Sequence, residues 1–437
     1  MLRRFLLVSL AAALALPGQA VASHPILKRG RTLAAVDDSP SASGTRTVAV
    51  ILFNFAGDQR RPYTVEQARR VMFTGEASLN AYLRESSFGR TGVTGDVFGW
   101  FTIPEQAHDC RFAQWGRAAQ ALATLSGVDL GAYQHRVFVF PNMPNCEWTG
   151  LAELPGSVAW INGELTVRVV GHELGHNLGA HHASGLRCTE GGVPVAIGGD
   201  CSLEEYGDPF DIMGGGQRHT SNWNKARLGW LGDSNRADVT ATGTYTLAAQ
   251  EALTADVQLL RIPRGDGLFY YVELRQPFGS FFDNFALADP AVRGITVRLA
   301  PDYSNTQQSQ LIDTNPATET FEDAPLTVGG TFADRGNGIW ITNRGVFGGK
   351  ATVEVSLGAP PKTARPPSKP RPRKPRVAGR RLQGGPGRDV LRGGPGNDTV
   401  MVRDRSRDAV RCGAGRDLVL ADGRDVVARD CEIVKVR

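Results

Sequence analysis

The segment from His172 to His182 (HELGHNLGAHH) constrains the fold of this chain more than any other stretch. Histidines four residues apart lie on one face of an α-helix, so His172 and His176 can bind one metal ion through their imidazoles. Gly179 permits a sharp turn after the helix, and this turn returns His182 to the same ion as a third ligand. Three protein ligands leave one coordination position open, which is typical of a catalytic zinc.

Glu173 follows the first of these histidines and stands beside the metal-binding face. From this position we expect it to act as the general base toward a water on the metal, the chemistry of peptide-bond hydrolysis. The opposite face of the helix has an apolar stripe that can pack into a core: Val167, Val170, Leu174 and Leu178. The alternative is a set of ordinary histidines that bind no metal. We favour the metal because such a pattern rarely arises by chance.

A methionine in a turn-rich segment follows the zinc motif. Met213 lies within YGDPFDIMGGG, from Tyr206 to Gly216. Taken alone, Met213 would be interpreted as a core residue. The pattern HExxHxxGxxH followed by such a methionine resembles the metzincin clan of zinc endopeptidases. In that clan a methionine-bearing turn forms a hydrophobic floor beneath the metal, and the resemblance implies this role for Met213.

Other segments make the resemblance narrower. YLRESSFGRTGVTGDVFGW, CEWTGLAELPG, the zinc motif and YGDPFDIMG together resemble the gametolysin family of metzincins. The likeness covers roughly residues 46–235 and extends toward 358. It implies that His172, His176 and His182 bind zinc, and that Glu173 is the catalytic glutamate. That family includes enzymes that degrade cell-wall or extracellular-matrix proteins, which implies a protein or peptide substrate. The linker, the tail and the short prosegment depart from the family.

The pattern of apolar, polar and turn-forming residues predicts two folded regions before residue 359. Strands and helices alternate up to the zinc motif, which indicates a mixed α/β catalytic domain over residues 46–235. The buried strands are expected at 46–55, 135–140 and 156–161. Residues 156–161 would form an edge strand with which an extended substrate pairs. Short alternating runs separated by Gly, Asp, Asn and Pro then predict an antiparallel β-sandwich over residues 236–358.

The N-terminus predicts export. The basic MLRR precedes an apolar run too short to span a bilayer and a small-residue cleavage site, so residues 1–22 are expected to be a signal peptide. Residues 23–45 would be a short propeptide or a disordered lead-in. No later apolar run approaches the roughly 20 residues of a membrane helix. We therefore expect a secreted, extracellular protein without a transmembrane segment.

The six cysteines fit an oxidising compartment. None forms a CxxC pair, so a second zinc site is not expected. Several pairings are open in principle. We expect cysteines that are neighbours in the sequence to pair: Cys110–Cys146, Cys188–Cys201 and Cys412–Cys431.

The net charge of +5 is local in origin. The Pro- and Arg/Lys-rich linker at 359–382 holds many of the basic residues, and the remainder of the mature chain is acidic. This distribution gives no reason to expect a nucleic-acid-binding fold. The linker could hold the protein on an anionic cell-surface polymer, or it could be a spacer.

The tail at 383–437 is repetitive. GGPGRDVLR and GGPGNDTVM are consecutive nonapeptides that resemble the calcium-binding β-roll repeats of RTX proteins, and CGAGRDLVL is a weaker copy. Asp389 and Asp398 supply carboxylates suited to Ca²⁺. Leu391, Val400 and Val419 occupy the inward position of each copy. The alternative is a disordered Gly-rich tail.

These patterns together predict a secreted zinc endopeptidase. Its substrates would be extracellular or cell-wall proteins, with Zn²⁺ in the active site and Ca²⁺ in the tail. The alternative function is a calcium-dependent adhesion or wall-binding protein whose peptidase-like domain is inactive. The intact Glu173 argues against that alternative, because a purely structural metal site needs no base there.

Overall fold

The computed structural model describes residues 27–28, 42–278, 281–305, 307–361 and 379–437. The chain divides into two compact units between Pro361 and Lys362. The expected signal peptide at 1–22 lies outside the described residues, as do most of the lead-in and most of the linker. Within the described ranges, no helix is long and apolar enough to cross a membrane.

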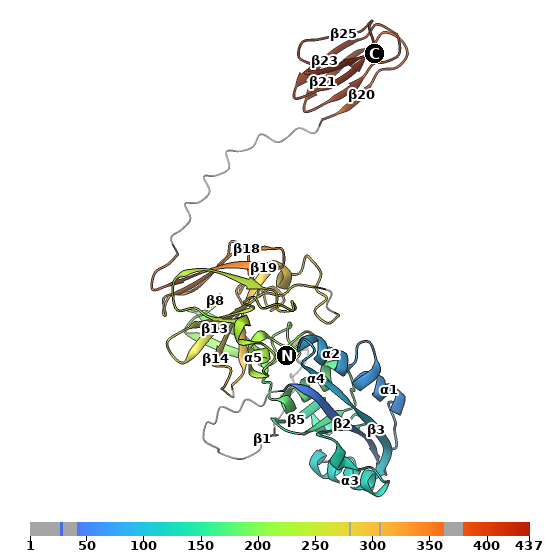
Figure 1. Cartoon of the computed structure of the whole chain (residues 1–437), viewed down its shortest axis with the longest axis vertical. Helices are drawn as coiled ribbons and strands as arrows, with labels where there is room; N and C mark the ends of the chain where they lie inside the picture. Colours follow the sequence, from blue (N-terminus) through green and yellow to red (C-terminus); the bar gives the residue numbers. More distant parts are fainter. Residues whose placement is uncertain (1–26, 29–41, 279–280, 306, 362–378) are drawn as a thin grey trace, which may run out of the picture. The chain divides into compact units, whose positions relative to one another are not determined.

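The first unit begins with a six-stranded sheet in the order β1-β5-β6-β4-β2-β3 (Figure 1). All neighbouring strands are parallel except β5 and β6, which are antiparallel. The strands are β1 (Leu27–Lys28), β2 (Gly44–Phe55), β3 (Thr91–Ile103), β4 (His135–Phe140), β5 (Gly150–Leu154) and β6 (Val158–Asn162). The three strands expected from the sequence correspond to β2, β4 and β6.

Helices cover both faces of this sheet (Figure 1). They are α1 (Val65–Arg69), continued by a π-helical turn (Arg70–Thr74), α2 (Leu79–Ser86), α3 (Phe112–Leu125) and α4 (Val167–Leu178). Short 3-10 turns lie at Leu130–Ala132 and Pro144–Cys146. Even-numbered residues of β2 from Val48 to Leu52 pack with α2 and α4, and odd-numbered residues from Ala49 to Phe53 pack with α3. Successive strand side chains point to opposite faces, so the continuous apolar run of β2 requires a cover on each.

Two further sheets of the first unit share one hydrophobic core. A nine-stranded sheet runs β10-β12-β13-β14-β15-β7-β8, with β9 paired to β7 and β16 to β14, and a four-stranded antiparallel sheet runs β11-β19-β18-β17. The strands of the larger sheet are β7 (Ala183–Glu190), β8 (Val193–Val195), β9 (Asp200–Glu204), β10 (Arg236–Asp238), β12 (Leu259–Pro263), β13 (Leu268–Glu273), β14 (Gly294–Pro301), β15 (Ser309–Ile312) and β16 (Leu326–Thr327). Those of the smaller sheet are β11 (Gly243–Ala248), β17 (Thr331–Asp334), β18 (Ile339–Phe347) and β19 (Lys350–Leu357). The helices α5 (Asn222–Arg227) and α6 (Pro290–Arg293) and a 3-10 turn (Asp233–Asn235) lie between these strands in the sequence.

This arrangement differs from the antiparallel sandwich predicted for residues 236–358. The pairs β10–β12 and β15–β7 are parallel. The larger sheet also includes β7, β8 and β9, which precede residue 235, so the sheet continues across the boundary that the sequence suggested. Alternation along a strand predicts which side chains face the core. It does not specify a partner strand far away in the sequence.

The second unit is a roll of two parallel sheets. One sheet contains β20 (Arg381–Gln383), β22 (Thr399–Met401), β24 (Leu418–Ala421) and β26 (Ile433–Val436), and the other contains β21 (Val390–Pro395), β23 (Ala409–Ala414) and β25 (Val426–Val427). The chain alternates between the two sheets, and Val400 and Val419 lie in the core between them while Leu391 packs against it. The segment before CGAGRDLVL, which was not assigned to a repeat, contributes the start of β23 and continues the roll.

The three predicted disulfides are present: Cys110–Cys146, Cys188–Cys201 and Cys412–Cys431. The second bond joins β7 to β9, where Cys188 and Cys201 are directly opposite in the antiparallel register. This pair closes the segment between the third histidine of the zinc motif and the turn that carries Met213. The third bond ties the last turns of the roll together.

Candidate metal centre

The helix α4 runs from Val167 to Leu178 and ends at Gly179, where the sequence predicts a turn. The Thr166 side chain accepts a hydrogen bond from the Val169 amide at 3.3 Å, which caps the N-terminus. At the C-terminus Gly179 has a φ of +106°, in the left-handed region that glycine favours, and the Ala180 amide donates to the Gly175 carbonyl at 2.9 Å. The four residues of the predicted apolar stripe are all buried in the core beneath the six-stranded sheet. The opposite face of the helix is thereby left for the histidines.

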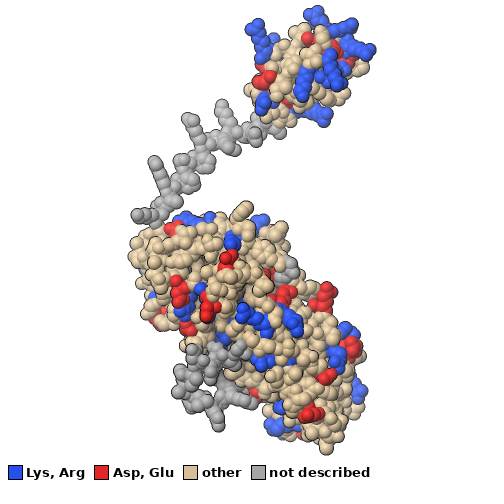
Figure 2. All heavy atoms as spheres, in the orientation of Figure 1, with Lys and Arg blue, Asp and Glu red and all other residues tan. Residues whose placement is uncertain are grey.

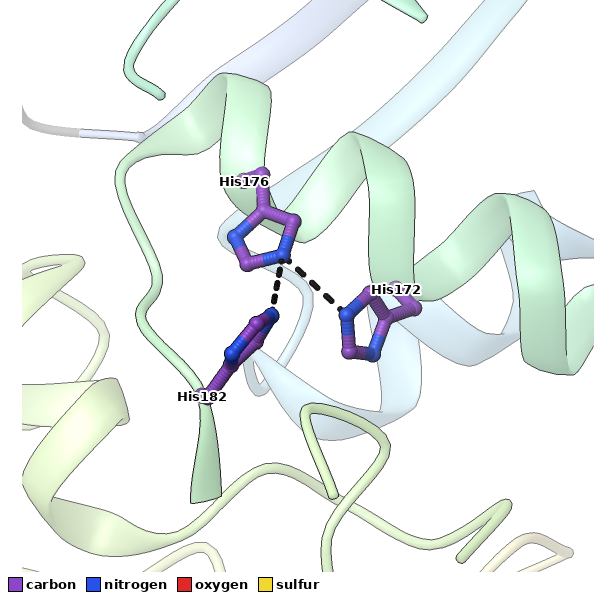
Figure 3. Close-up of side chains that lie close together, drawn as sticks. All are labelled: His172, His176 and His182. Carbon is purple, nitrogen blue, oxygen red and sulfur yellow. Dashed lines mark hydrogen bonds between the residues drawn. The ribbon is translucent and has the colours of Figure 1, made fainter. Parts of the chain in front are cut away.

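The structure brings the three predicted histidines together (Figure 3). His176 Nε2 lies 3.1 Å from His172 Nε2 and 3.0 Å from His182 Nε2. His172 and His176 come from successive turns of α4, and His182 comes from the segment between Gly179 and β7. Within the part of the chain that the structure describes, no other group of three His, Cys, Asp or Glu side chains is close enough to share one ion.

The hydrogen bonds of the Nδ1 atoms show which nitrogen of each imidazole can bind a metal ion. His172 Nδ1 lies 2.9 Å from the Ile212 carbonyl, and His176 Nδ1 lies 2.9 Å from the Ala180 carbonyl. A carbonyl oxygen can only accept, so each Nδ1 carries the proton and each neutral ring has a lone pair on Nε2. Ligands of a tetrahedral zinc with Zn–N bonds of about 2.0–2.1 Å are about 3.3 Å apart. The observed spacing and the converging lone pairs fit a zinc ion.

Glu205 orients the third histidine in the same way. His182 Nδ1 lies 2.9 Å from Glu205 Oε1, and a carboxylate accepts this proton. The His182 side chain is buried, while the Glu205 side chain is 39% exposed, and partial burial raises the pKa of the Glu205 carboxyl. The sequence interpretation missed Glu205. Its position directly before the YGDPFDIMGGG segment was the only available signal.

Replacing Glu205 with alanine is expected to weaken zinc binding by about 10–100-fold, the usual effect of removing the hydrogen-bond partner of a histidine ligand. Competition with a fluorescent zinc chelator would measure the affinity. Glu205→Gln is the matched control, because its amide oxygen still accepts the His182 proton, and it should retain most of the affinity. Equal affinities for Glu205→Ala and the parent protein would show that Glu205 does not position His182.

Glu173 is buried beside the histidines. Its carboxylate packs against the first residue of β5, since a Cβ atom on Gly150 would lie only 2.2 Å from Glu173 Oε1. Burial raises the pKa of the Glu173 carboxyl well above its ordinary value. Glu173 is also one of the residues that line a cavity beside the histidines.

Met213 lies under α4 between the two helical ligands. A Cβ atom on Gly175 would lie 2.5 Å from Met213 Sδ, so the thioether packs closely on the helix at a point where only glycine fits. The preceding residue, Ile212, supplies the carbonyl that orients His172. Met213 and its turn therefore pack against the helix that carries His172 and His176.

A buried ionic network holds the Met213 turn in place. Asp211 accepts hydrogen bonds from the Met213 amide at 2.9 Å and the Ser221 amide at 2.7 Å. Asp208 pairs with Arg298 of β14, and Arg298 also pairs with Glu273 of β13. Burial raises the pKa of the Asp211 carboxyl. These groups connect the zinc-site turn to the nine-stranded sheet, and none of them was identified from the sequence.

A cavity of about 380 Å³ opens beside the histidines. Its lining includes His172, Glu173, Tyr206 and Ile212 from the site itself, and Trp148 from the CEWTGLAELPG segment. The Tyr206 ring centroid lies 4.4 Å from that of His182. Apolar walls with few polar groups are typical of a ligand-binding cleft. Glu173 thus lies at the wall of this cleft.

The edge strand predicted at 156–161 is wrong. β6 lies between β4 and β5, so both of its edges are paired. β5 begins one residue after Thr149, which lines the cavity, and among the described residues β1 pairs with Glu153 and Leu154 on the outer side of β5. The order of strands in a sheet depends on long-range pairing, which the local sequence does not contain.

The two aspartates assigned to calcium lie in the roll of the second unit. Asp389 Oδ2 accepts from the Gly385 amide at 2.7 Å, and Asp398 Oδ1 accepts from the Arg380 amide. The second carboxylate oxygens of Asp398, Asp408 and Asp417 are buried and have no hydrogen-bond partner. Asp408 was missed because its segment lacks the glycines of the repeat. The described carboxylates of the roll do not form a group of three close enough to share one ion.

The histidine cluster, the buried glutamate and the α/β fold define a metallopeptidase. The chain belongs to the gametolysin peptidase M11 family, whose sequence model matches residues 47–266, half of the chain. This match confirms the family resemblance found in the motifs.

Two solved structures share limited similarity with the chain. One, described as a chaperone–substrate complex, is 16% identical over 32% of this chain and 24% of that chain, with a TM-score of 0.22. The chain thus spans about a quarter of that protein's length. Archaemetzincin from Methanopyrus kandleri is 20% identical over 33% of this chain and 77% of that chain, with a TM-score of 0.19. Neither TM-score supports an argument, and no curated protein matches.

Proposed function

We propose that this metallopeptidase is a zinc-dependent endopeptidase of the metzincin type. The observation that carries the proposal is the convergence of three histidine Nε2 atoms beside a buried glutamate at the wall of a cleft. His172, His176 and His182 would hold the ion. When bound, zinc polarises a carbonyl group and lowers the pKa of water.

The chain's own residues supply the proton transfers. Glu173 would take the proton of the attacking water and then give it to the nitrogen of the leaving amine. Burial favours the protonated form of this carboxyl group, which helps it to hold the proton between the two transfers. Gly150 leaves room for the carboxylate at the start of β5, so the proton carrier lies next to the edge at which a peptide would bind.

An extended substrate would lie along β5. Residues 150–152 pair with β6 on one side, and on the other side the described residues of β1 pair with Glu153 and Leu154. Addition of a peptide strand at this edge would fix the scissile bond by main-chain hydrogen bonds, with little dependence on side chains. The apolar cleft lined by Trp148 and Ile212 would then receive one substrate side chain.

Three disulfides support export to an oxidising environment, which the expected signal peptide at 1–22 also favours. The proposed substrates are therefore extracellular or cell-wall proteins. The alternative remains an adhesion protein with an inactive peptidase-like domain. Digestion of a peptide library with and without a zinc chelator separates these functions. Chelator-sensitive cleavage supports the peptidase, and the absence of cleavage by zinc-loaded protein contradicts it.

We further propose that the roll binds Ca²⁺. One oxygen of each carboxylate of Asp398, Asp408 and Asp417 is buried without a hydrogen-bond partner, which supports this proposal because a buried polar atom left unpaired is costly. An ion that binds only the ordered roll stabilises it by linkage.

Calcium is accordingly expected to slow backbone hydrogen exchange in residues 383–437 of the intact protein by at least about tenfold. Mass spectrometry would compare saturating calcium with a calcium-selective chelator, and the first unit provides an internal reference. Asp398→Asn should reduce the calcium effect. Identical exchange of the tail in both conditions would leave a roll that folds without calcium.

A further inference from the structure

The basic and acidic side chains of the roll differ in exposure. Within residues 379–437, all thirteen Arg and Lys side chains are exposed, whereas seven of the nine Asp and Glu residues are buried or only partly exposed. The basic residues are Arg380, Arg381, Arg388, Arg392, Arg403, Arg405, Arg407, Arg411, Arg416, Arg424, Arg429, Lys435 and Arg437. On the face visible in Figure 2, Lys and Arg side chains project from the roll and acidic side chains are fewer.

The carboxylates are engaged by the backbone. Every Asp and Glu of the roll accepts a hydrogen bond from at least one main-chain amide. Asp408, for example, accepts from the amide of Asp389 on the preceding turn at 2.8 Å, and Asp417 accepts from that of Asp398. Within residues 379–437 no Arg or Lys forms a salt bridge with them. The positive surface is therefore not neutralised by the roll itself.

Three arginines recur at the same place in successive turns. Each of Arg388, Arg407 and Arg424 is followed directly by an aspartate. These three aspartates are hydrogen-bonded from one turn to the next, amide to carboxylate. Adjacent strands of a sheet are about 4.8 Å apart, so these residues form a column with one guanidinium group per turn. Arg392 and Arg411 are also directly opposite in β21 and β23. We call Arg388, Arg407 and Arg424 the arginine column.

We propose that the arginine column binds an anionic polysaccharide, independently of the peptidase site. Guanidinium groups bind sulfate-, phosphate- or carboxylate-type anions through two parallel hydrogen bonds, and a regular column suits a polymer with repeated charges. Residues 379–437 contain no Phe, Tyr, Trp or His, so the roll lacks the stacking surfaces used for single-stranded nucleic acids. It also has no helix to enter a DNA groove or to lie in a membrane interface.

The test uses the intact protein and heparin, a sulfated polysaccharide, with neutral dextran as the control polymer. The triple variant Arg388→Gln, Arg407→Gln, Arg424→Gln is expected to bind heparin at least about tenfold more weakly than the parent. The matched control is Arg61→Gln, Arg90→Gln, Arg117→Gln. It removes the same charge from exposed arginines of the first unit that form no salt bridge, and it should stay within about twofold of the parent. Replacing the column by lysines should restore part of the affinity.

Circular dichroism and hydrogen exchange of the roll would verify that each variant is folded, and peptide cleavage is not needed as a readout. Equal weakening by the two glutamine triples would mean that net charge alone governs binding, which would overturn the proposal. A parent protein that does not bind heparin would also overturn it. So would tighter binding to duplex DNA or to vesicles of anionic phospholipid than to heparin.

Discussion

Replacing Glu173 with glutamine is expected to lower peptide turnover by at least ~10²-fold while zinc remains bound, since general-base catalysis typically contributes 10²–10⁴-fold. Glutamine has nearly the same shape, so it should preserve the packing of residue 173 against Gly150. Its amide cannot take a proton from water. The measurement is the initial rate of cleavage of one library peptide, combined with the zinc content of the same sample.

Glu147→Gln is the control for this experiment. Glu147 lines the same cavity but is exposed and precedes β5, so its removal changes the local charge without removing the proposed base. It should keep turnover within about threefold of the parent, as expected when no catalytic contact is lost. Glu173→Gln protein that cleaves the peptide at the parental rate would exclude Glu173 as the proton carrier.

His176→Ala is expected to abolish zinc binding and peptide cleavage together. His176 is the central member of the cluster, because its Nε2 atom lies within 3.1 Å of both other Nε2 atoms. Without it, two ligands remain, and two ligands do not make the usual three-ligand catalytic site. Metal content after dialysis and the rate of peptide cleavage are the two measurements.

His108→Ala is the control variant, since the His108 side chain is 56% exposed and pairs with Asp109 on the surface. It should retain both zinc and activity. The contrast between His176→Ala and Glu173→Gln is informative as well, because only the histidine variant should lose the metal. A His176→Ala protein that keeps a full complement of zinc would contradict the proposed ligand set.

The zinc site could be predicted because its geometry is local. Spacing along one helix places His172 and His176 on a common face, and Gly179 allows the turn that brings in His182. The nearest-neighbour disulfides are local in the same sense, as Cys188 and Cys201 face each other across a β-hairpin-like pairing. The apolar run of β2 likewise predicted a strand covered on both faces.

The residues that position the site could not be predicted because their partners are distant in the sequence. Arg298 of β14 pairs with Asp208, 90 residues earlier, and the strands β7, β8 and β9 separate Glu205 from His182 in the sequence. No local periodicity indicates these contacts. The wrong edge strand has the same origin: β6 has the composition of a buried strand, and only the sheet order shows that it lies between β4 and β5.

The roll has more turns than the glycine-rich repeats of the sequence predict. The glycine-rich copies predicted two turns, and the structure continues the roll through the glycine-poor segment that contains Asp408. The feature that persists through the roll is an acidic side chain hydrogen-bonded to the preceding turn, and not the glycines. Calcium binding at these carboxylates stays a prediction.

The most direct test of zinc-dependent peptide hydrolysis is a titration of metal-free protein with zinc while cleavage of a library peptide is recorded. Metal would first be removed with ortho-phenanthroline, with its non-chelating isomer as the control treatment. Activity is expected to be absent from the metal-free protein and to rise in proportion to added zinc until each chain holds one ion, with Glu173→Gln protein binding the same zinc without cleavage. Cleavage that persists in the metal-free protein, or a zinc-loaded parent that cleaves no peptide, would contradict the proposed function.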